Sequence, residues 1–340
     1  MRAGSANTRF LELIENFAGK HVLAIGDLML DEFIWGRVSR ISPEAPVPVV
    51  NVVGESYYPG GAANVARNLR EFTAAAAVMG RIGNDDAGCR LLQLLGAAGI
   101  DTAGVQQDAA AVTTLKTRIV ARHQQVVRVD RERPAPLDGE QAEQARAHVE
   151  RVIAAVDAVV VADYGKGFLT QAFADTLCGL ARKHGKVLTI DPHPRTSLVW
   201  RGATAIKPNR AEAFNAAGVQ PAEPVDPVLR DEALLEAGKR LLQKWETNNL
   251  LITLGEQGML LFQGNETPRH IPARAQEVFD VSGAGDTAIA VFTLALSAGA
   301  TPEEAAELAN RASGIVVGKL GTATVTPAEL RASFESDSLH

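Results

Sequence analysis

The stretch from Asp157 to Asp191, DAVVVADYGKGFLTQAFADTLCGLARKHGKVLTID, contains the pattern that decides the fold. An apolar, β-branched run at 157–162 is followed by an amphipathic helical pattern over 170–184, and then by a second apolar run at 186–191. Strands that are apolar on both faces are typical of parallel sheets that helices cover on both sides. The stretch therefore predicts one strand, helix, strand unit of a parallel sheet.

The same alternation continues on both sides of this unit. Two extended regions, about 34–53 and 113–131, interrupt it without a helix of their own, and we expect them to form a small second sheet. The sequence thus predicts an α/β fold with a mostly parallel sheet and helices on both faces. Further strands are predicted at 22–27, 76–82, 204–207 and 250–254, and further helices at 62–71, 86–98, 138–155 and 231–246.

The composition is that of a folded globular protein. Of the 340 residues, 46% are hydrophobic and 22% are charged, and the formal net charge is −6. An acidic balance argues against a general nucleic-acid binder, which needs a broad basic surface. No apolar run reaches the ~20 residues of a membrane-spanning helix, and charged residues interrupt the first thirty positions. We expect a cytoplasmic protein with no membrane partner.

A glycine-rich turn near the C-terminus, Asp280-Val-Ser-Gly-Ala-Gly-Asp286, precedes a predicted helix that begins near Thr287. The glycines of this turn allow successive N–H groups to point outward at the positive end of that helix, which is a phosphate-binding geometry. Asp286 would repel a resting diphosphate, but it suits a base that accepts the proton of an attacking hydroxyl group. A helix-capping aspartate is the alternative interpretation of the same turn.

The turn also satisfies the pattern G-x-G-x-x-A of dinucleotide-binding proteins, through Gly283, Gly285 and Ala288. That pattern requires a strand after the helix, with an acidic residue at the strand's end. Here a second helix is predicted instead, because Thr301-Pro302-Glu303-Glu304 is a strong helix start. We therefore reject a dinucleotide site, and the P-loop motif is absent as well.

Polar residues follow other predicted strands, where ligands bind in open α/β sheets. Asp27 ends the first strand and has the oxygens to accept sugar hydroxyls, although a turn aspartate is equally compatible. Gly60-Gly61-Ala-Ala-Asn64 brings backbone and an amide close to a small ligand at a helix start. A simple turn explains Gly60 but gives Asn64 no role.

Two more such loops suit a nucleotide. Lys207-Pro-Asn209-Arg-Ala-Glu212 offers a cation for phosphate, and an amide and a carboxylate for a hydrated magnesium ion. Asn209 and Glu212 are also a helix capping box, which is the competing interpretation. Thr253-Leu-Gly255-Glu-Gln-Gly258 allows a nucleotide to approach closely, or is only a hairpin turn.

Basic residues gather in the second extended region. Lys116, Arg118 and Arg122 share one face of a strand and can bind phosphate through charge-assisted hydrogen bonds. Arg128 lies in the same region, and Lys166 lies in the turn after the strand 157–162. A solvated sheet face is the alternative.

Four of these motifs resemble those of the ribokinase-like, phosphofructokinase-B-type carbohydrate kinases, and the resemblance covers about Phe10 to Leu330. The motifs are the turn 280–286 and the loops 60–64, 207–212 and 253–258. The resemblance implies one kinase domain over residues 1–340, three α/β/α layers with a small β-sheet lid, and ATP and Mg²⁺ as cofactors. It implies Asp286 as the catalytic base, with the amides of Ala284 and Gly285 in the anion hole, and it includes Gly283 among the catalytic residues of the turn. Sugar-phosphate residues would be Asp27, Gly60, Gly61, Asn64, Lys116, Arg118, Arg128 and Lys166, and nucleotide residues Lys207, Asn209, Glu212, Thr253, Gly255, Gly258 and Asn310, with Asn209 and Glu212 on the metal.

Within that family, RVSRISPEAPVPV at 37–49 and the segment 116–130 look like the kinases of D-glycero-D-manno-heptose 7-phosphate. The expected reaction is phosphorylation of the anomeric hydroxyl for the lipopolysaccharide core. The alternatives are a kinase of the same fold for a fructose phosphate, ribose or a ketodeoxy acid, and a sugar-binding module without catalysis. Exposed strand edges in the lid favour a homodimer.

Overall fold

The computed structural model describes residues 3–121, 124–274, 278–319 and 321–335, so the predicted basic residue Arg122 lies outside the described part. Within these residues a nine-stranded sheet has the order β13-β12-β11-β10-β9-β8-β1-β4-β5. Neighbours from β11 to β5 are parallel, and β12 and β13 are antiparallel. The strands are β1 His21–Gly26, β4 Ala75–Gly83, β5 Asp101–Asp108, β8 Ala158–Ala162, β9 Val187–Asp191, β10 Ala205–Ile206, β11 Asn249–Thr253, β12 Met259–Gln263 and β13 Arg269–Ile271.

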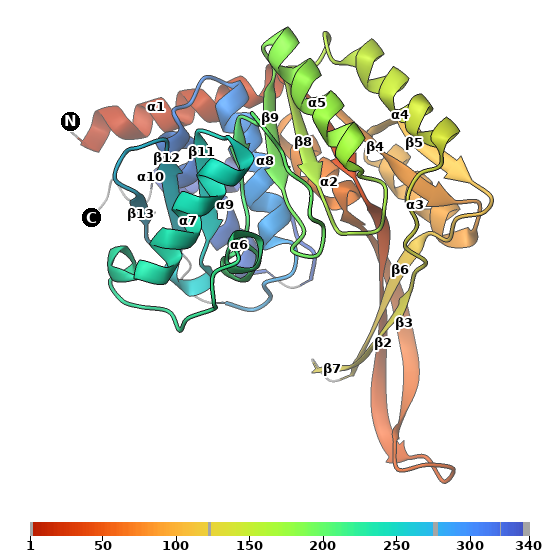
Figure 1. Cartoon of the computed structure of the whole chain (residues 1–340). Helices are drawn as coiled ribbons and strands as arrows, with labels where there is room; N and C mark the ends of the chain where they lie inside the picture. The colour runs from red at the N-terminus through yellow and green to blue at the C-terminus, as the bar shows by residue number, and fades with distance from the viewer. Residues whose placement is uncertain (1–2, 122–123, 275–277, 320, 336–340) are drawn as a thin grey trace.

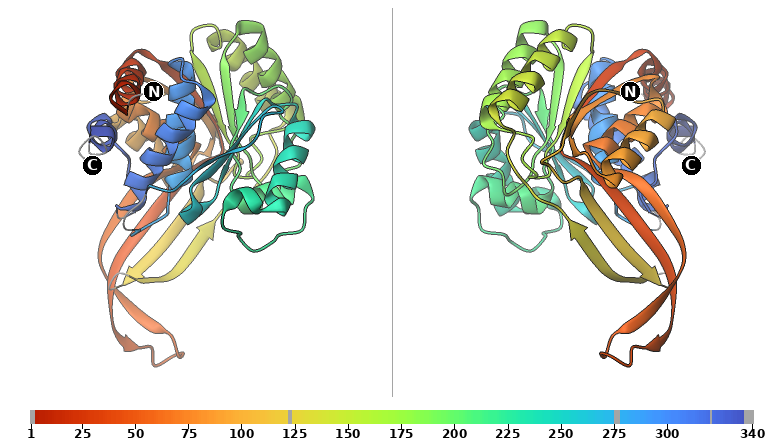
Figure 2. Two further views of the ribbon diagram at one scale, coloured as in Figure 1. Left: turned by 90° about the vertical axis from the view of Figure 1, so that its left-hand side faces the viewer. Right: turned by 90° about the vertical axis from the view of Figure 1, so that its right-hand side faces the viewer.

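Helices cover both faces of this sheet, which confirms the predicted three-layer arrangement (Figure 2). The central strands are apolar on both sides: in β1, Val22 and Ala24 face one core, and Leu23 and Ile25 face the other. One layer contains α1 Ala3–Asn16, α2 Ala62–Phe72, α3 Asp86–Ala97, α8 Ala284–Ser297, α9 Pro302–Val317 and α10 Pro327–Glu335. The opposite layer contains α4 Gly139–Val152, α5 Gln171–His184, α6 Arg210–Ala217 and α7 Glu232–Trp245.

The predicted strands and helices agree with the observed ones to within a few residues. The predicted helix start at Thr301 is confirmed, since its side chain and Glu304 form a capping box at the start of α9. The sequence did not predict β5, β13, α1 or α10, and it indicated α6 and β12 only through the alternative interpretations of 209–212 as a capping box and of 253–258 as a hairpin turn. β5 lies at a sheet edge and carries polar residues, and β13 is only three residues long, so neither shows a clear apolar pattern.

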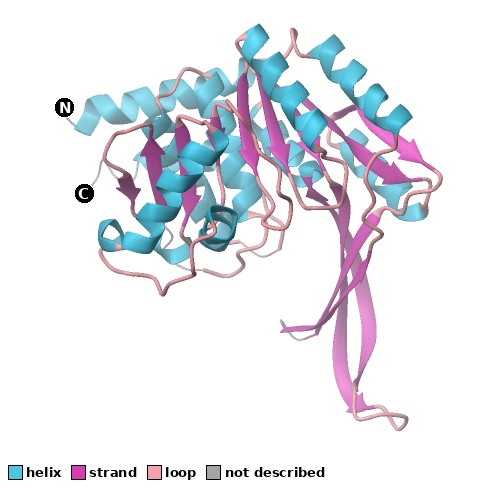
Figure 3. Ribbon diagram, in the orientation of Figure 1, coloured by secondary structure: helices cyan, strands magenta, loops and turns pink. Residues whose placement is uncertain are grey.

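A second sheet of four strands in the described residues has the order β3-β2-β6-β7 and projects from the body (Figures 1 and 3). It consists of β2 Leu28–Ile41, β3 Pro48–Gly61, β6 Thr114–Ala121 and β7 Gln124–Arg131. We call it the lid. Its first hairpin extends beyond the predicted 34–53 at both ends. The roots of β2 and β3 are buried, so their sequence pattern does not differ from that of the main core.

Candidate active site

The predicted glycine-rich turn forms the N-terminus of α8. Gly283 is the residue before the helix and has a left-handed backbone, with φ 81°. A Cβ at this position would come within 3.1 Å of the amide nitrogen of Asn64, so glycine also lets α8 approach α2. The N–H of Ala284 donates to the carbonyl of Val281 at 3.3 Å, whereas the N–H groups of Gly285 and Asp286 belong to the first turn, which has no acceptors within the helix.

Asp286 is buried, and two side chains from other elements hold its carboxylate. The amide nitrogen of Asn64 donates to Oδ2 at 2.7 Å, and the hydroxyl of Tyr164 donates to Oδ1 at 2.5 Å. Asn64 comes from α2 and Tyr164 from the loop after β8, so three elements converge on the base. The structure therefore brings together the predicted Asp286 and Asn64, and it adds Tyr164, which the sequence did not single out.

The electrostatics of Asp286 suit proton transfer near neutral pH. Burial raises its pKa to about 6, and the charge of Asp191 adds to the increase, while the hydrogen bonds from Tyr164 and Asn64 and the charge of Lys207 oppose it. A carboxyl group with this pKa is mostly ionised at pH 7 and is a stronger base than an ordinary aspartate.

Asp286 lines a cavity of about 600 Å³ at the carboxyl ends of the parallel strands. Lys207, buried, makes a 3.0 Å ion pair with Asp191 in its wall. Burial raises the pKa of Asp191 and of Asp163 to about 6 and also raises the pKa of Glu212. Four carboxylates line the cavity, from Asp163, Asp191, Glu212 and Asp286, against the two basic side chains Lys207 and Arg210, and this charge balance favours a bound cation.

The predicted nucleotide residues line this cavity and a second one of about 490 Å³ beside it. Thr253 and Gly255 line both cavities, which places the two side by side. The second cavity is more apolar, with Met259 and Ala288 in its wall. The turn 253–258 is also the connection of the antiparallel pair β11 and β12, as its simpler interpretation predicts. The other predicted residues are distributed as follows: Lys207, Asn209 and Glu212 line the first cavity, and Gly258 and Asn310 line the second.

Asn209 and Glu212 form the capping box of α6, so that interpretation is confirmed. Glu212 Oε2 accepts the N–H of Asn209 at 2.7 Å, and Asn209 Oδ1 accepts the N–H of Glu212 at 2.9 Å. In the described residues no three His, Cys, Asp or Glu side chains converge on one metal position. The remaining oxygens, in an acidic wall, fit a magnesium ion that keeps several of its water molecules.

The carboxylate of Asp27 is used by the protein itself. It accepts the backbone N–H groups of Tyr164, Lys166 and Phe168 at 2.9, 2.9 and 3.2 Å. We therefore assign Asp27 first to holding the loop 164–168, and only one of about four lone-pair positions is left for a sugar hydroxyl. We call this set of bonds the Asp27 clamp.

Gly60 and Gly61 have a structural reason in the pairing of β2 with β3. They lie opposite Met29 and Leu28, and a Cβ at Gly61 would come within 2.5 Å of the carbonyl oxygen of Asp27. A Cβ at Gly60 would collide with the carboxylate of Asp31. These glycines shape the root of the lid beside the site, while Asn64 follows them into the active centre.

The predicted phosphate-binding cations are mostly paired already. Arg118 is bonded to the buried carboxylate of Asp31, Arg128 to Asp130 at 2.9 and 3.0 Å, and Lys166 to Glu132 at 2.7 Å. Lys116 differs from them. Its ammonium group lies 5.8 Å from the centroid of the Tyr164 ring, no ion pair of Lys116 occurs among the described residues, and burial lowers its pKa.

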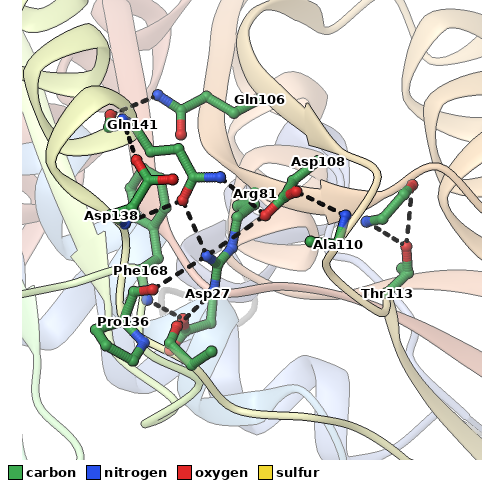
Figure 4. Close-up of polar contacts among 12 residues, drawn as sticks. Asp27, Arg81, Gln106, Asp108, Ala110, Thr113, Pro136, Asp138, Gln141 and Phe168 are labelled. Carbon is green, nitrogen blue, oxygen red and sulfur yellow. Dashed lines mark hydrogen bonds and ion pairs between the residues drawn. The ribbon is translucent and has the colours of Figure 1, made fainter.

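Arg81 of β4 fastens the segment that leaves the lid (Figure 4). It donates to the carbonyl of Pro136 at 3.3 Å and to the side chain of Gln141 at 3.2 Å, and lies 3.8 Å from Asp108. This cluster lies next to the Asp27 clamp, because Asp27 and Arg81 line one small cavity together. The segment that follows the second lid hairpin is therefore held beside the loop 164–168.

Comparison with known proteins identifies the family of the chain. The profile described as "pfkB family carbohydrate kinase" matches residues 20–329. The chain is 43% identical over 324 residues to "Bifunctional protein HldE" of Desulfatibacillum aliphaticivorans, covering 95% of this chain and 65% of that protein. It is 46% identical over 322 residues to the protein of the same name from Caulobacter vibrioides, covering 94% and 64%. The chain thus spans a little under two thirds of these relatives' length.

Solved structures with low sequence identity share the fold. The structure of phosphofructokinase-2 from Escherichia coli, in complex with substrates and products, matches this chain with a TM-score of 0.73 at 17% identity. The match covers 94% of this chain and 99% of that protein chain. Ribokinase from Thermotoga maritima has a TM-score of 0.69 at 20% identity, covering 93% and 99%. The fold is ribokinase-like, and the chain belongs to the pfkB family of carbohydrate kinases, which are phosphotransferases.

Proposed function

We propose that the chain transfers the γ-phosphoryl group of ATP to the anomeric hydroxyl of D-glycero-β-D-manno-heptose 7-phosphate. The product would be the 1,7-bisphosphate used for ADP-heptose and the lipopolysaccharide core. The observation that carries the kinase chemistry is the buried Asp286, held by two donors at the edge of the cleft. The heptose substrate is supported by the segment 37–49 and by the relatives named HldE.

In the proposed reaction Asp286 accepts the proton of the sugar hydroxyl as its oxygen attacks the γ-phosphorus. A new oxygen–phosphorus bond forms, the bond from the γ-phosphorus to the β–γ bridging oxygen breaks, and ADP leaves with that electron pair. The first-turn N–H groups of α8 face the charge that develops on the transferred group. The side-chain oxygen Oδ1 of Asn64 is buried without a partner among the described residues, and it suits a sugar hydroxyl.

Asn209 and Glu212 would hold the hydrated Mg²⁺ on the nucleotide side, and Lys207 would face phosphate. A bound magnesium ion supplies charge neutralisation between the phosphates. Asn209 and Glu212 lie at the N-terminus of α6, and the positive end of that helix favours the phosphate groups of the nucleotide rather than the cation itself. We infer the cytoplasm as the compartment from the use of ATP as donor. Separately, among the described residues no helix has both the length and the apolar character to cross a membrane.

We further propose that the chain acts as a single kinase domain and forms a homodimer through the lids. Val127 and Val129 point to the same side of the edge strand β7, and both are exposed, at 44% and 53%. An apolar edge of this kind is a pairing surface unless it is covered. Val129→Lys should lower the molar mass seen by analytical ultracentrifugation, and an unchanged mass would contradict pairing through this edge.

The substrate proposal is tested by measuring ADP release with free and phosphorylated sugars. We expect heptose 7-phosphate to give the highest kcat/KM, and ³¹P NMR to show a new ester at the anomeric carbon. Faster turnover with a fructose phosphate, ribose or a ketodeoxy acid would select that sugar instead. Sugar binding without any ADP release would favour a binding module that lacks catalysis.

A further inference from the structure

Tyr164 lies directly after β8 and bonds to two functional aspartates. Its hydroxyl donates to Oδ1 of Asp286 at 2.5 Å, and its backbone N–H donates to Oδ2 of Asp27 at 2.9 Å. The two partners are 122 and 137 positions away in the sequence. One residue thus connects the end of the first strand with the base on α8.

The loop that carries Tyr164 has a fixed shape. Three N–H groups of the loop 164–168 are bonded to Asp27. Gly165 and Gly167 have φ angles of 68° and 102°, which residues with a Cβ rarely adopt. The main chain therefore fixes the position of the Tyr164 backbone, and only two side-chain torsions remain to place the ring and its hydroxyl group.

The carboxylate of Asp286 is held from both sides. Tyr164 binds one oxygen and Asn64 binds the other, so the plane of the group is fixed. Each carboxylate oxygen has two lone pairs, so each retains one for a substrate hydroxyl. Two donors can therefore orient the base without blocking it.

Charged groups from several elements surround this pair. Asp286 faces Asp191 and Lys207, whose effects on its proton affinity are opposite. Tyr164 faces Asp191, Asp31 and, over its ring, the ammonium group of Lys116. A cation above the ring withdraws electron density and makes the phenol a better donor. The lid thus places a cation over the ring whose hydroxyl binds the base.

We propose that Tyr164 is a positioning residue for phosphoryl transfer: its hydroxyl, placed by the Asp27 clamp, orients the Asp286 carboxylate toward the acceptor hydroxyl. This inference rests on the proposed kinase function. Tyr164 touches the base and not the reacting atoms, so its removal should act on the rate of the chemical step and on proton affinity rather than on substrate binding.

The experiment compares Tyr164→Phe with the parent enzyme over pH 5 to 9. We expect kcat to fall about 10- to 100-fold while KM for both substrates changes little, because orientation of the base is lost. Loss of the donor removes a bond that favours the ionised carboxylate, so the pKa of Asp286 rises and the acidic limb of the kcat profile shifts to higher pH. The same substrates are used throughout, so their own titration cancels.

Tyr57→Phe is the matched control. The Tyr57 hydroxyl also donates to a carboxylate, that of Glu55 at 2.9 Å, but on the lid and away from Asp286. It should leave both kcat and the acidic limb unchanged. An unshifted limb and normal kcat in Tyr164→Phe would overturn the inference, and so would a large rise in sugar KM with the limb in place.

A second probe covers the case in which Tyr164→Phe does not fold. 3-Fluorotyrosine at position 164 keeps the ring and makes the phenol a stronger donor, so the acidic limb should move to lower pH; no movement would contradict the inference. Asp286→Asn separates the two levels. If it retains turnover, the proposed function fails, whereas a normal Tyr164 variant with an inactive Asp286→Asn rejects only the role of Tyr164.

Discussion

The buried end of the cleft and the lid use charge in opposite ways. Around Asp286 the carboxylates outnumber the cations, and buried Lys207 compensates only part of the charge. In the lid, Arg118 and Arg128 already have carboxylate partners, and of the predicted phosphate-binding lid residues Lys116 alone lacks one in the described structure. The number of charged residues in a region therefore does not predict which charges are free to bind a ligand. That depends on which side chains are paired with one another.

Asp286→Asn should have the largest effect on this comparison, because it removes the base and leaves the shape of the site. We expect kcat to fall about 10²- to 10⁴-fold. Sugar and nucleotide affinities, measured by calorimetry, should stay within a few-fold of the parent. Turnover close to normal would mean that the negative charge of the buried region has no catalytic role.

Lys207→Met should destabilise the protein, because it leaves Asp191 buried without its cation. Breaking a buried ion pair costs up to about 3 to 5 kcal/mol, and uptake of a proton by Asp191 reduces that cost. Lys207 lowers the pKa of Asp191, so its loss raises that pKa above about 6. In the folded variant, ionised Asp191 is then unfavourable up to a higher pH than in the parent protein. The loss in free energy of unfolding should therefore grow between pH 5 and pH 8.

Urea unfolding at both pH values measures this effect. The double variant Lys207→Met, Asp191→Asn is the control, since it removes the unpaired charge as well, and it should recover most of the stability at pH 8. A loss of stability that does not depend on pH would point to packing of the lysine stem rather than to its charge.

The buried region was the easier one to predict from sequence. Strands such as 158–162 are apolar on both faces, and the turn 280–286 joins directly to a helix, so both patterns are local. Asn64 could be associated with Asp286 only through the family resemblance. Tyr164 was missed because an aromatic residue after a strand usually packs, and its partner lies 122 positions away.

The lid was harder to predict because its chemistry depends on register. Arg128 and Asp130 are two positions apart on one strand, which the sequence shows, but Arg118 meets Asp31 only through the parallel pairing of β6 with β2. Similarly, a strand-end aspartate such as Asp27 shows no sign in sequence that three backbone N–H groups will bind it. Local patterns predict which residues reach the site, whereas tertiary pairing decides which are free.

Lys116→Met tests whether the unpaired lid cation binds the substrate phosphate. A charge-assisted bond contributes about 1.5 to 3 kcal/mol, so KM for the phosphorylated sugar should rise about 10-fold or more. Arg128→Met is the matched variant, and it should raise KM less than about fivefold, because its pair with Asp130 is exposed. KM for an unphosphorylated sugar should not separate the two variants. Equal effects on the phosphorylated sugar would show that pairing does not control availability.

Asp130→Asn should have the smallest effect, and it tests the same idea from the other side. Asp130 pairs with Arg128 and lies opposite Lys116 in the register of β6 with β7, so it neutralises cations on this face. Removing its charge should lower KM for the phosphorylated sugar about twofold at low salt, since exposed pairs contribute only about 0.2 to 1 kcal/mol. The gain should shrink at high salt, because screening weakens interactions between exposed charges. A KM that rises instead would mean that Asp130 orders Arg128 for binding, and the lid pairs would then be part of the phosphate site rather than its competitors.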